Sequence, residues 1–154
     1  MSDPQTSIFD ADRFMDAETR ESFETRPTPI PARDYTAAMI DKIEIRQDGE
    51  WTIADVSWHI LDDALTTELD MERVLARQSI FLDVEPDGSM QYGKNKNTGL
   101  GNLREIFGQN NPGEPWSPRR LVGQGPATIT VKHKPSKKDP NEVFANVTKV
   151  ARAS

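Results

Sequence analysis

The chain has 154 residues and a net charge of −6 at pH 7, from 19 Lys and Arg residues against 25 Asp and Glu residues. It contains no cysteine, which excludes disulfides, thiolate metal sites and a catalytic thiol. No apolar run approaches the roughly 18 residues that a membrane span needs, and the first residues lack the apolar core of a signal peptide. We therefore expect an intracellular protein with no membrane partner.

The charge is distributed unevenly along the chain. Residues 1–88 hold 21 acidic and 8 basic residues, whereas residues 89–154 hold 4 acidic and 11 basic residues. Such a division is typical of a charged arm joined to a face that binds a polyanion. The acidic total is therefore no argument against a nucleic-acid partner.

The N-terminal residues 1–26 are predicted to form an acidic arm. They carry scattered apolar residues, and we expect either a flexible arm or one that packs on its own domain or on a neighbouring subunit. Alternate prolines in residues 27–32 favour an extended connector and forbid a helix. We place the domain boundary there, with a domain at residues 33–150 and a short C-terminal tail at residues 151–154.

Alternation of apolar and polar residues predicts strands at residues 35–45, 51–61 and 74–84. Asp48-Gly49 and Asp87-Gly88 predict the turns that end the first and third strands. Residues 62–72 form a polar link between the second and third strands. Trp58 and Phe81 are predicted core residues.

A helix is predicted at residues 99–110, where Leu100, Leu103, Ile106 and Phe107 recur at helical spacing before Gly108. Strands at residues 127–134 and 143–150 complete a mostly β chain. Three strands, one helix and two further strands (β-β-β-α-β-β) are the element order of the OB-fold, a five-stranded and partly open barrel. A split β-sandwich with an added helix has the same order and remains an alternative.

Sequence motifs give little support to an enzyme. The chain has no phosphate-binding P-loop and no Gly-x-Ser-x-Gly elbow, and two histidines are too few for a histidine-rich metal site. Asp10 and Asp12 do not fit a calcium loop, because Phe14 and Met15 stand where a ligand and a glycine belong. We expect no catalytic residue, no metal and no cofactor.

The basic residues of the second half form three clusters, each near an aromatic residue. Nucleic-acid binding needs positive charge along a path of phosphates, and single strands also stack on exposed aromatic rings. Any one of these residues also fits a solvated strand face, and Trp116 also fits a loop plug packed on the barrel. We predict phosphate contacts from Lys94, Lys96, Arg119, Arg120, Lys132, Lys134, Lys137 and Lys138, and base stacking on Trp51, Tyr92, Trp116 and Phe144.

Several segments together resemble a known group. They are Pro-Ile-Pro-Ala-Arg-Asp-Tyr-Thr-Ala at 29–37, Gly-Lys-Asn-Lys-Asn at 93–97, Leu-Gly-Asn-Leu-Arg at 100–104 and Phe-Gly-Gln-Asn at 107–110, followed by Trp116 and the residues from Val122 to Val131. This pattern, over about residues 28–150, resembles bacteriophage single-stranded DNA-binding proteins with an OB-type barrel and an acidic extension. The C-terminal residues 151–154 depart from the acidic tail that many such proteins use for recruitment.

The resemblance implies non-sequence-specific binding of single-stranded DNA in phage replication or recombination, in the bacterial host cytoplasm. We also expect a homo-oligomer, with phage or host replication and recombination proteins as further partners. Two other functions remain open. One is a virion structural or decoration protein whose acidic arm docks on basic patches of its neighbours, and the other is a DNA charge mimic that inhibits a host enzyme.

Overall fold

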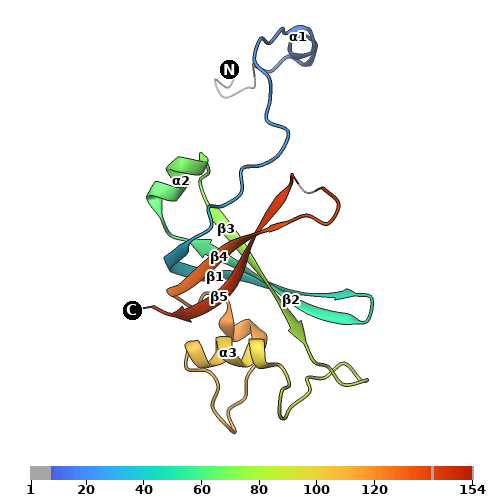
Figure 1. The fold of residues 1–154 in the computed structure, drawn as a ribbon, viewed down its shortest axis with the longest axis vertical. Helices are drawn as coiled ribbons and strands as arrows, with labels where there is room; N and C mark the ends of the chain where they lie inside the picture. The colour runs from blue at the N-terminus through green and yellow to red at the C-terminus, as the bar shows by residue number, and fades with distance from the viewer. Residues whose placement is uncertain (1–7, 140, 154) are drawn as a thin grey trace, which may run out of the picture.

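The protein, described here from a computed structural model, is mostly β, as predicted. The structure describes residues 8–139 and 141–153. The strands are β1 (Asp34–Asp48), β2 (Trp51–Ile60), β3 (Val74–Leu82), β4 (Ala127–Pro135) and β5 (Val143–Arg152). They pair in the order β1-β2-β3-β5-β4, and pairing of β1 with β4 closes the barrel (Figure 1).

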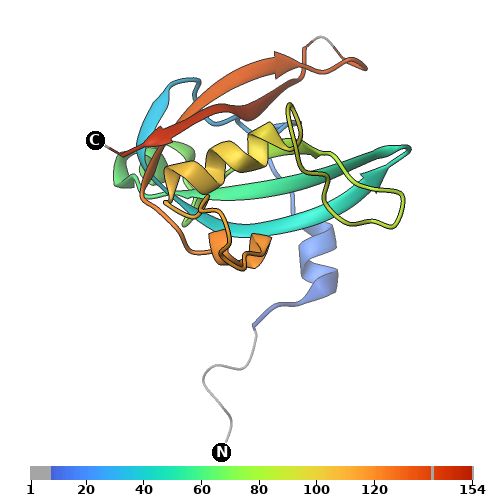
Figure 2. The same cartoon turned by 90° about the horizontal axis from the view of Figure 1, so that it is seen from below.

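Neighbouring strands run antiparallel, except that β3 and β5 are parallel and share a single register pair, Arg77 with Asn146. The helix α3 (Thr98–Ile106) joins β3 to β4, as predicted, and lies across one end of the barrel (Figures 1 and 2). It buries Leu100 and Leu103 in the core.

Three short helices were not part of the predicted order: α1 (Ala11–Asp16), α2 (Asp63–Leu69) and the 3-10 helix η1 (Pro118–Leu121). The prediction of a polar link at residues 62–72 is wrong, because α2 occupies most of it. Asp62 caps this helix by accepting a hydrogen bond from the Leu65 amide at 3.1 Å, and Asp70 ends it in a left-handed conformation. A single fully buried apolar residue, Leu65, fixes the helix to the core.

Alternate residues of β2 build the core. Val56, Trp58 and Ile60 point inward and are almost completely buried, which agrees with the alternation of apolar and polar residues that predicts this strand. The indole Nε1 of Trp58 donates a hydrogen bond to Gln78 Oε1 at 2.9 Å, so its polar atom is satisfied. Each fully buried aliphatic side chain stabilises such a core by roughly 1.5–3 kcal/mol.

Phe81 is not a core residue, which corrects the prediction. Val74, Ala76 and Ile80 point into the barrel from β3, so Phe81 falls on the opposite face and is 60% exposed. Its ring packs edge-on against Trp51 outside the barrel.

The described part of the N-terminal arm, residues 8–26, extends away from the barrel, and α1 buries none of its residues (Figure 1). The connector is fixed to the barrel: the carbonyl of Ile30 lies 2.6 Å from His133 Nε2, and Tyr35 donates its hydroxyl to the Pro31 carbonyl at 2.6 Å. Arg26 forms an ion pair with Asp139 in the β4–β5 loop. The first seven residues of the predicted arm and Ser154 of the predicted tail lie outside the described residues.

Candidate nucleic-acid interface

An exposed aromatic pair lies on the outer side of β2 and β3. Trp51 and Phe81 are 56% and 60% exposed, and their ring centres are 5.5 Å apart in an edge-to-face arrangement. Neither ring is needed to fill the core, so both keep surface on which a base can stack. We call the outward-facing side of β1, β2 and β3 around this pair the outer face.

Two arginines on the outer face are held by one buried carboxylate. Arg46 Nε donates to Asp55 Oδ2 at 2.6 Å, and Arg77 donates to the same oxygen. Ser79 Oγ donates to the other carboxylate oxygen at 3.0 Å. Asp55 is 8% exposed, whereas the side chains of Arg46 and Arg77 are 41% and 57% exposed. The arrangement fixes two positive charges on the same face of the sheet as the aromatic pair, with Arg77 four residues along β3 from Phe81.

The pKa of Asp55 reflects this environment. Burial opposes ionisation and raises the pKa, but hydrogen bonds from Arg77, Arg46 and Ser79 together outweigh it, so the pKa lies below its usual range. Asp55 is therefore charged at neutral pH. It partly offsets the positive charge of the arginines while it keeps them in place.

The strand register extends the outer face onto β5 and β4. Arg77 is the partner of Asn146 on β5, and Asn146 is the partner of Lys132 on β4. The next pair on this side is Phe144 with Lys134, and both side chains are exposed. Because partner residues share one side of a sheet, these positions continue the surface that begins at Arg77. Lys137 and Lys138 lie in the loop at the end of the same hairpin.

Asn97 closes the loop between β3 and α3. Its side-chain oxygen accepts from the Asp83 amide at 2.7 Å, and its side-chain nitrogen donates to the carbonyls of Asp83 and Gln91 at 2.9 Å each. Its backbone is left-handed, a conformation that asparagine tolerates. The closed loop carries Lys94 and Lys96 together with Tyr92, which is 84% exposed.

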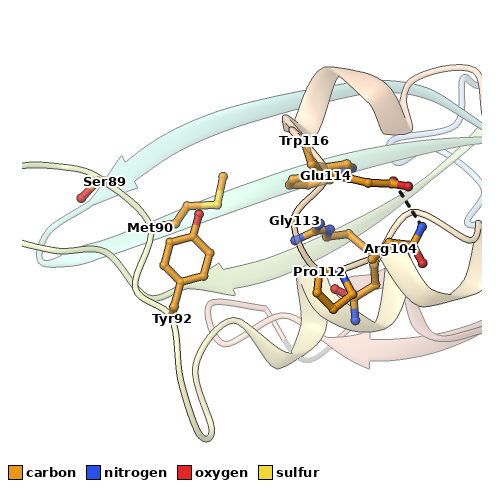
Figure 3. Close-up of a pocket in the computed structure, with 10 residues that line it drawn as sticks. Ser89, Met90, Tyr92, Arg104, Pro112, Gly113, Glu114 and Trp116 are labelled. Atoms are coloured by element: carbon orange, nitrogen blue, oxygen red, sulfur yellow. Dashed lines mark hydrogen bonds between the residues drawn. The ribbon is translucent and has the colours of Figure 1, made fainter.

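Trp116 lies at a separate cavity next to this loop. Its indole Nε1 donates to Gln109 Oε1 at 2.8 Å, and the guanidinium carbon of Arg104 lies 4.2 Å from its ring centre. Tyr92 lines the same cavity, which has a volume of about 660 Å³ (Figure 3). The structure thus brings two of the predicted stacking residues together, away from the Trp51–Phe81 pair.

The predicted arginines Arg119 and Arg120 belong to η1. Arg119 lines a groove with Ile43 and Ile45 of β1. Ile43 is the partner of Val56, whose side chain is buried in the barrel, so this groove lies on the other side of the β1–β2 hairpin from Arg46. Arg120 donates to the Pro115 carbonyl at 2.9 Å. Neither residue joins the outer face.

Sequence reasoning missed Phe81, Arg46, Arg77 and Arg104 as candidates. Strand periodicity could have found Phe81, because it alternates with the inward-facing Ile80 and shares a phase with Arg77. Arg46 and Arg77 lie in the first half of the chain, where acidic residues outnumber basic ones, so the charge of that half gave no sign of them. The role of Asp55 depends on cross-strand register, which local sequence does not contain.

Across residues 8–139 and 141–153, no group of three or more His, Asp or Glu residues is arranged to hold a metal ion. No helix in that part of the chain is long and apolar enough to cross a membrane. Comparison with protein-family models and with curated proteins found no match to this chain.

Proposed function

We propose that the chain is a non-enzymatic, OB-fold single-stranded DNA-binding protein that acts in phage replication or recombination. The strand order β1-β2-β3-β5-β4, the parallel contact between β3 and β5, and the helix between β3 and β4 support the fold. OB-folds bind oligonucleotides on strands 2 and 3 and on the loops that join strands 1–2 and 4–5. The outer face occupies this place on the barrel.

The observation that carries the proposal is the exposed Trp51–Phe81 pair on the same face of the sheet as Arg46 and Arg77. Stacking on an aromatic ring is worth about 1–3 kcal/mol per base and tolerates any sequence. Arginines beside the rings supply charge to the phosphates on either side of a stacked base. A single strand fits this surface better than a duplex, because duplex bases are already stacked on each other.

Fluorescence anisotropy with a labelled oligothymidylate of about 20 nucleotides tests the proposal, since one OB domain covers roughly 4–16 nucleotides. We expect binding at low salt and a linear fall of log K with log salt concentration. Replacing Trp51 and Phe81 together by Ala should weaken binding about tenfold or more. Trp51→Phe keeps a ring and is the matched control.

The charge contribution is tested by comparing arginines on the two sides of the β1–β2 hairpin. Arg77→Ala should weaken binding and reduce the salt slope by about 0.7, the value for one lost phosphate contact with a single strand. Arg119→Ala removes the same charge from the groove on the other side of the β1–β2 hairpin. It should change neither the affinity for the strand nor the salt slope. Absence of binding at low salt, or binding without a salt slope, contradicts the proposal.

A second candidate, a virion structural or decoration protein, is favoured by the arm alone. Its apolar side chains Ile8, Phe14 and Phe23 are 97%, 68% and 81% exposed. A subunit assembly that persists in high salt, together with no affinity for DNA, would support this function. Affinity for a basic host protein instead of DNA would support the charge mimic.

A further inference from the structure

We propose that the cavity between the β3–α3 loop and the α3–β4 segment is a second nucleic-acid site, which takes one unpaired nucleobase and prefers guanine. The proposal rests on the proposed DNA binding and adds a base preference to it. The cavity has a volume of about 660 Å³, within the range of pockets that bury small ligands. Figure 3 shows Met90 and Tyr92 on one side and Arg104, Pro112 and Trp116 on the other.

The floor of the cavity is held rigidly by Gln109. Its carbonyl accepts from Arg104 Nε and Nη2 at 3.2 and 3.1 Å, and its side chain accepts from Trp116 and donates to the Arg120 carbonyl at 2.9 Å. The Arg104 guanidinium is thereby fixed against the Trp116 ring. Such a pre-formed surface loses little conformational entropy when a ligand binds.

The opposite wall supplies a second surface for stacking. Tyr92 is 84% exposed and follows Gln91, whose carbonyl is bound by Asn97. Unpaired bases stack on aromatic rings and on guanidinium planes. A base that enters between Tyr92 and Arg104 has one surface of each kind, and the Trp116 ring backs the guanidinium.

The third wall selects the edge of the base. Glu114 has a carboxylate that accepts a weak hydrogen bond from Asn111 Nδ2 at 3.3 Å, and Asn111 donates also to the Gly108 carbonyl at 3.0 Å. The wall therefore offers mainly acceptor oxygens. Guanine presents two adjacent N–H donors on its pairing edge, whereas thymine presents one donor between two carbonyl oxygens. The negative charge of Glu114 also disfavours a phosphate in this position.

The experiment measures the affinity of the full chain for oligothymidylate and for an alternating thymidine–guanosine strand of equal length. We expect the alternating strand to bind about fivefold tighter or more, the discrimination of one good bidentate base contact. Glu114→Gln should abolish this preference, measured as the ratio of the two affinities, because the lost negative charge acts on both strands alike. Tyr92→Ala should also remove it, whereas Tyr92→Phe keeps the ring and should retain it.

Equal affinity for the two strands, or a preference that survives both Glu114→Gln and Tyr92→Ala, would overturn the cavity proposal and leave the outer face standing. If neither strand binds, the proposed function fails, and titration with dGMP and dTMP decides the cavity separately. A saturable NMR shift of the Trp116 indole N–H with dGMP, at least about fivefold tighter than with dTMP, would then support it. No shift, or equal shifts, would overturn it.

Discussion

Asp55 is a buried acidic residue that holds two arginines in place on the surface. Its carboxylate binds Arg46 and Arg77, which come from strands on either side of β2. Buried charges need such partners, because an unpaired carboxylate in this position costs several kcal/mol. The residue therefore sets both local stability and the geometry of the arginines.

Replacing Asp55 by Asn tests this role through pH. The folded pKa of Asp55 is lowered, so its contribution to stability is present at neutral pH and is lost as the pH falls through that folded value. We expect Asp55→Asn to lower the free energy of unfolding by about 1–3 kcal/mol at neutral pH. The difference from wild type should shrink as the pH falls through the acid range.

Urea denaturation at a series of pH values measures this difference. Asp48→Asn is the matched control, because Asp48 is exposed and its carboxylate lies 3.8 Å from Arg46. The control should change stability little at any pH. A penalty for Asp55→Asn that stays constant down to low pH would contradict the assignment.

A second prediction about a single residue concerns Asn97. Asn97→Ala removes three side-chain hydrogen bonds and places alanine in a left-handed conformation. We expect a loss of about 2–4 kcal/mol in the free energy of unfolding and faster proteolysis within residues 83–97. Asn95→Ala is the control, since Asn95 has a similar backbone conformation and no side-chain hydrogen bond among the described residues. Equal losses for both variants would refute the closing role of Asn97.

Local sequence predicted some of these residues and missed others for a physical reason. Trp51 and Tyr92 stand next to turns, where a large ring has little core to enter, and both are exposed. Trp116 is half-buried and packs on the core, as the predicted loop plug requires, and it also lines the cavity, whereas its base stacking stays a prediction. The partners of Asp55 lie 9 and 22 residues away in the sequence, so the ion pairs appear only after the strands are in register.

Among the elements, the segment before β4 depends on a close approach to β1. Ile40 donates its amide to the Gln124 carbonyl at 2.9 Å, and Gly123 donates to the Ile40 carbonyl at 2.8 Å. Gly125 follows with a φ of +149°, and a Cβ there would lie 2.6 Å from Met39 Sδ and 2.8 Å from the Ala38 carbonyl oxygen. Glycine is required both for the conformation and for the contact.

Gly125→Ala should therefore destabilise the protein by roughly 2–4 kcal/mol, from backbone strain and overpacking together. Gly113→Ala is the matched control, because Gly113 also has a positive φ but has no atom within 4 Å of the added Cβ. Gly113→Ala should lower the free energy of unfolding by only about 1–2 kcal/mol. Thermal or urea denaturation measures both, and equal costs would rule out the steric contribution.

The strands were predictable because each has one face toward the barrel and alternates accordingly. Helix α2 was not, because it is only seven residues long and has few apolar anchors, the buried Leu65 and the partly buried Leu69. The element order predicted a barrel but left a split sandwich open. Closure depends on pairing β1 with β4 at Asp34–Thr130, Tyr35–Ile129 and Ala38–Ala127, and no local pattern distinguishes this pairing from a sandwich.

On the scale of the whole molecule, the acidic arm changes the balance of charge. Residues 1–25 hold seven acidic and two basic residues, so they carry five of the six net negative charges of the chain. The ion pair of Arg26 with Asp139 makes the arm leave the barrel beside Lys137 and Lys138. The arm is therefore tethered next to the cations of the proposed DNA surface.

Deleting residues 1–25 should tighten binding of single-stranded DNA at low salt, and the gain should fall as salt screens the charges. Anisotropy titrations of the full and truncated chains measure this gain. A full chain with Phe9→Ala and Phe14→Ala keeps the arm's charge and should bind like wild type. Unchanged or weaker binding after truncation would exclude masking by the arm.

The single register pair between β3 and β5 has a consequence for opening of the barrel. This seam joins Arg77 to Asn146, and beyond it lies Lys132, so the proposed DNA surface crosses the least extensively paired boundary of the sheet. A nucleic-acid strand that lies from Arg77 to Lys132 would bridge the seam and bind only the closed barrel. Mass action then disfavours opening. Backbone amides along β5 should consequently exchange their hydrogens with solvent more slowly when DNA is bound.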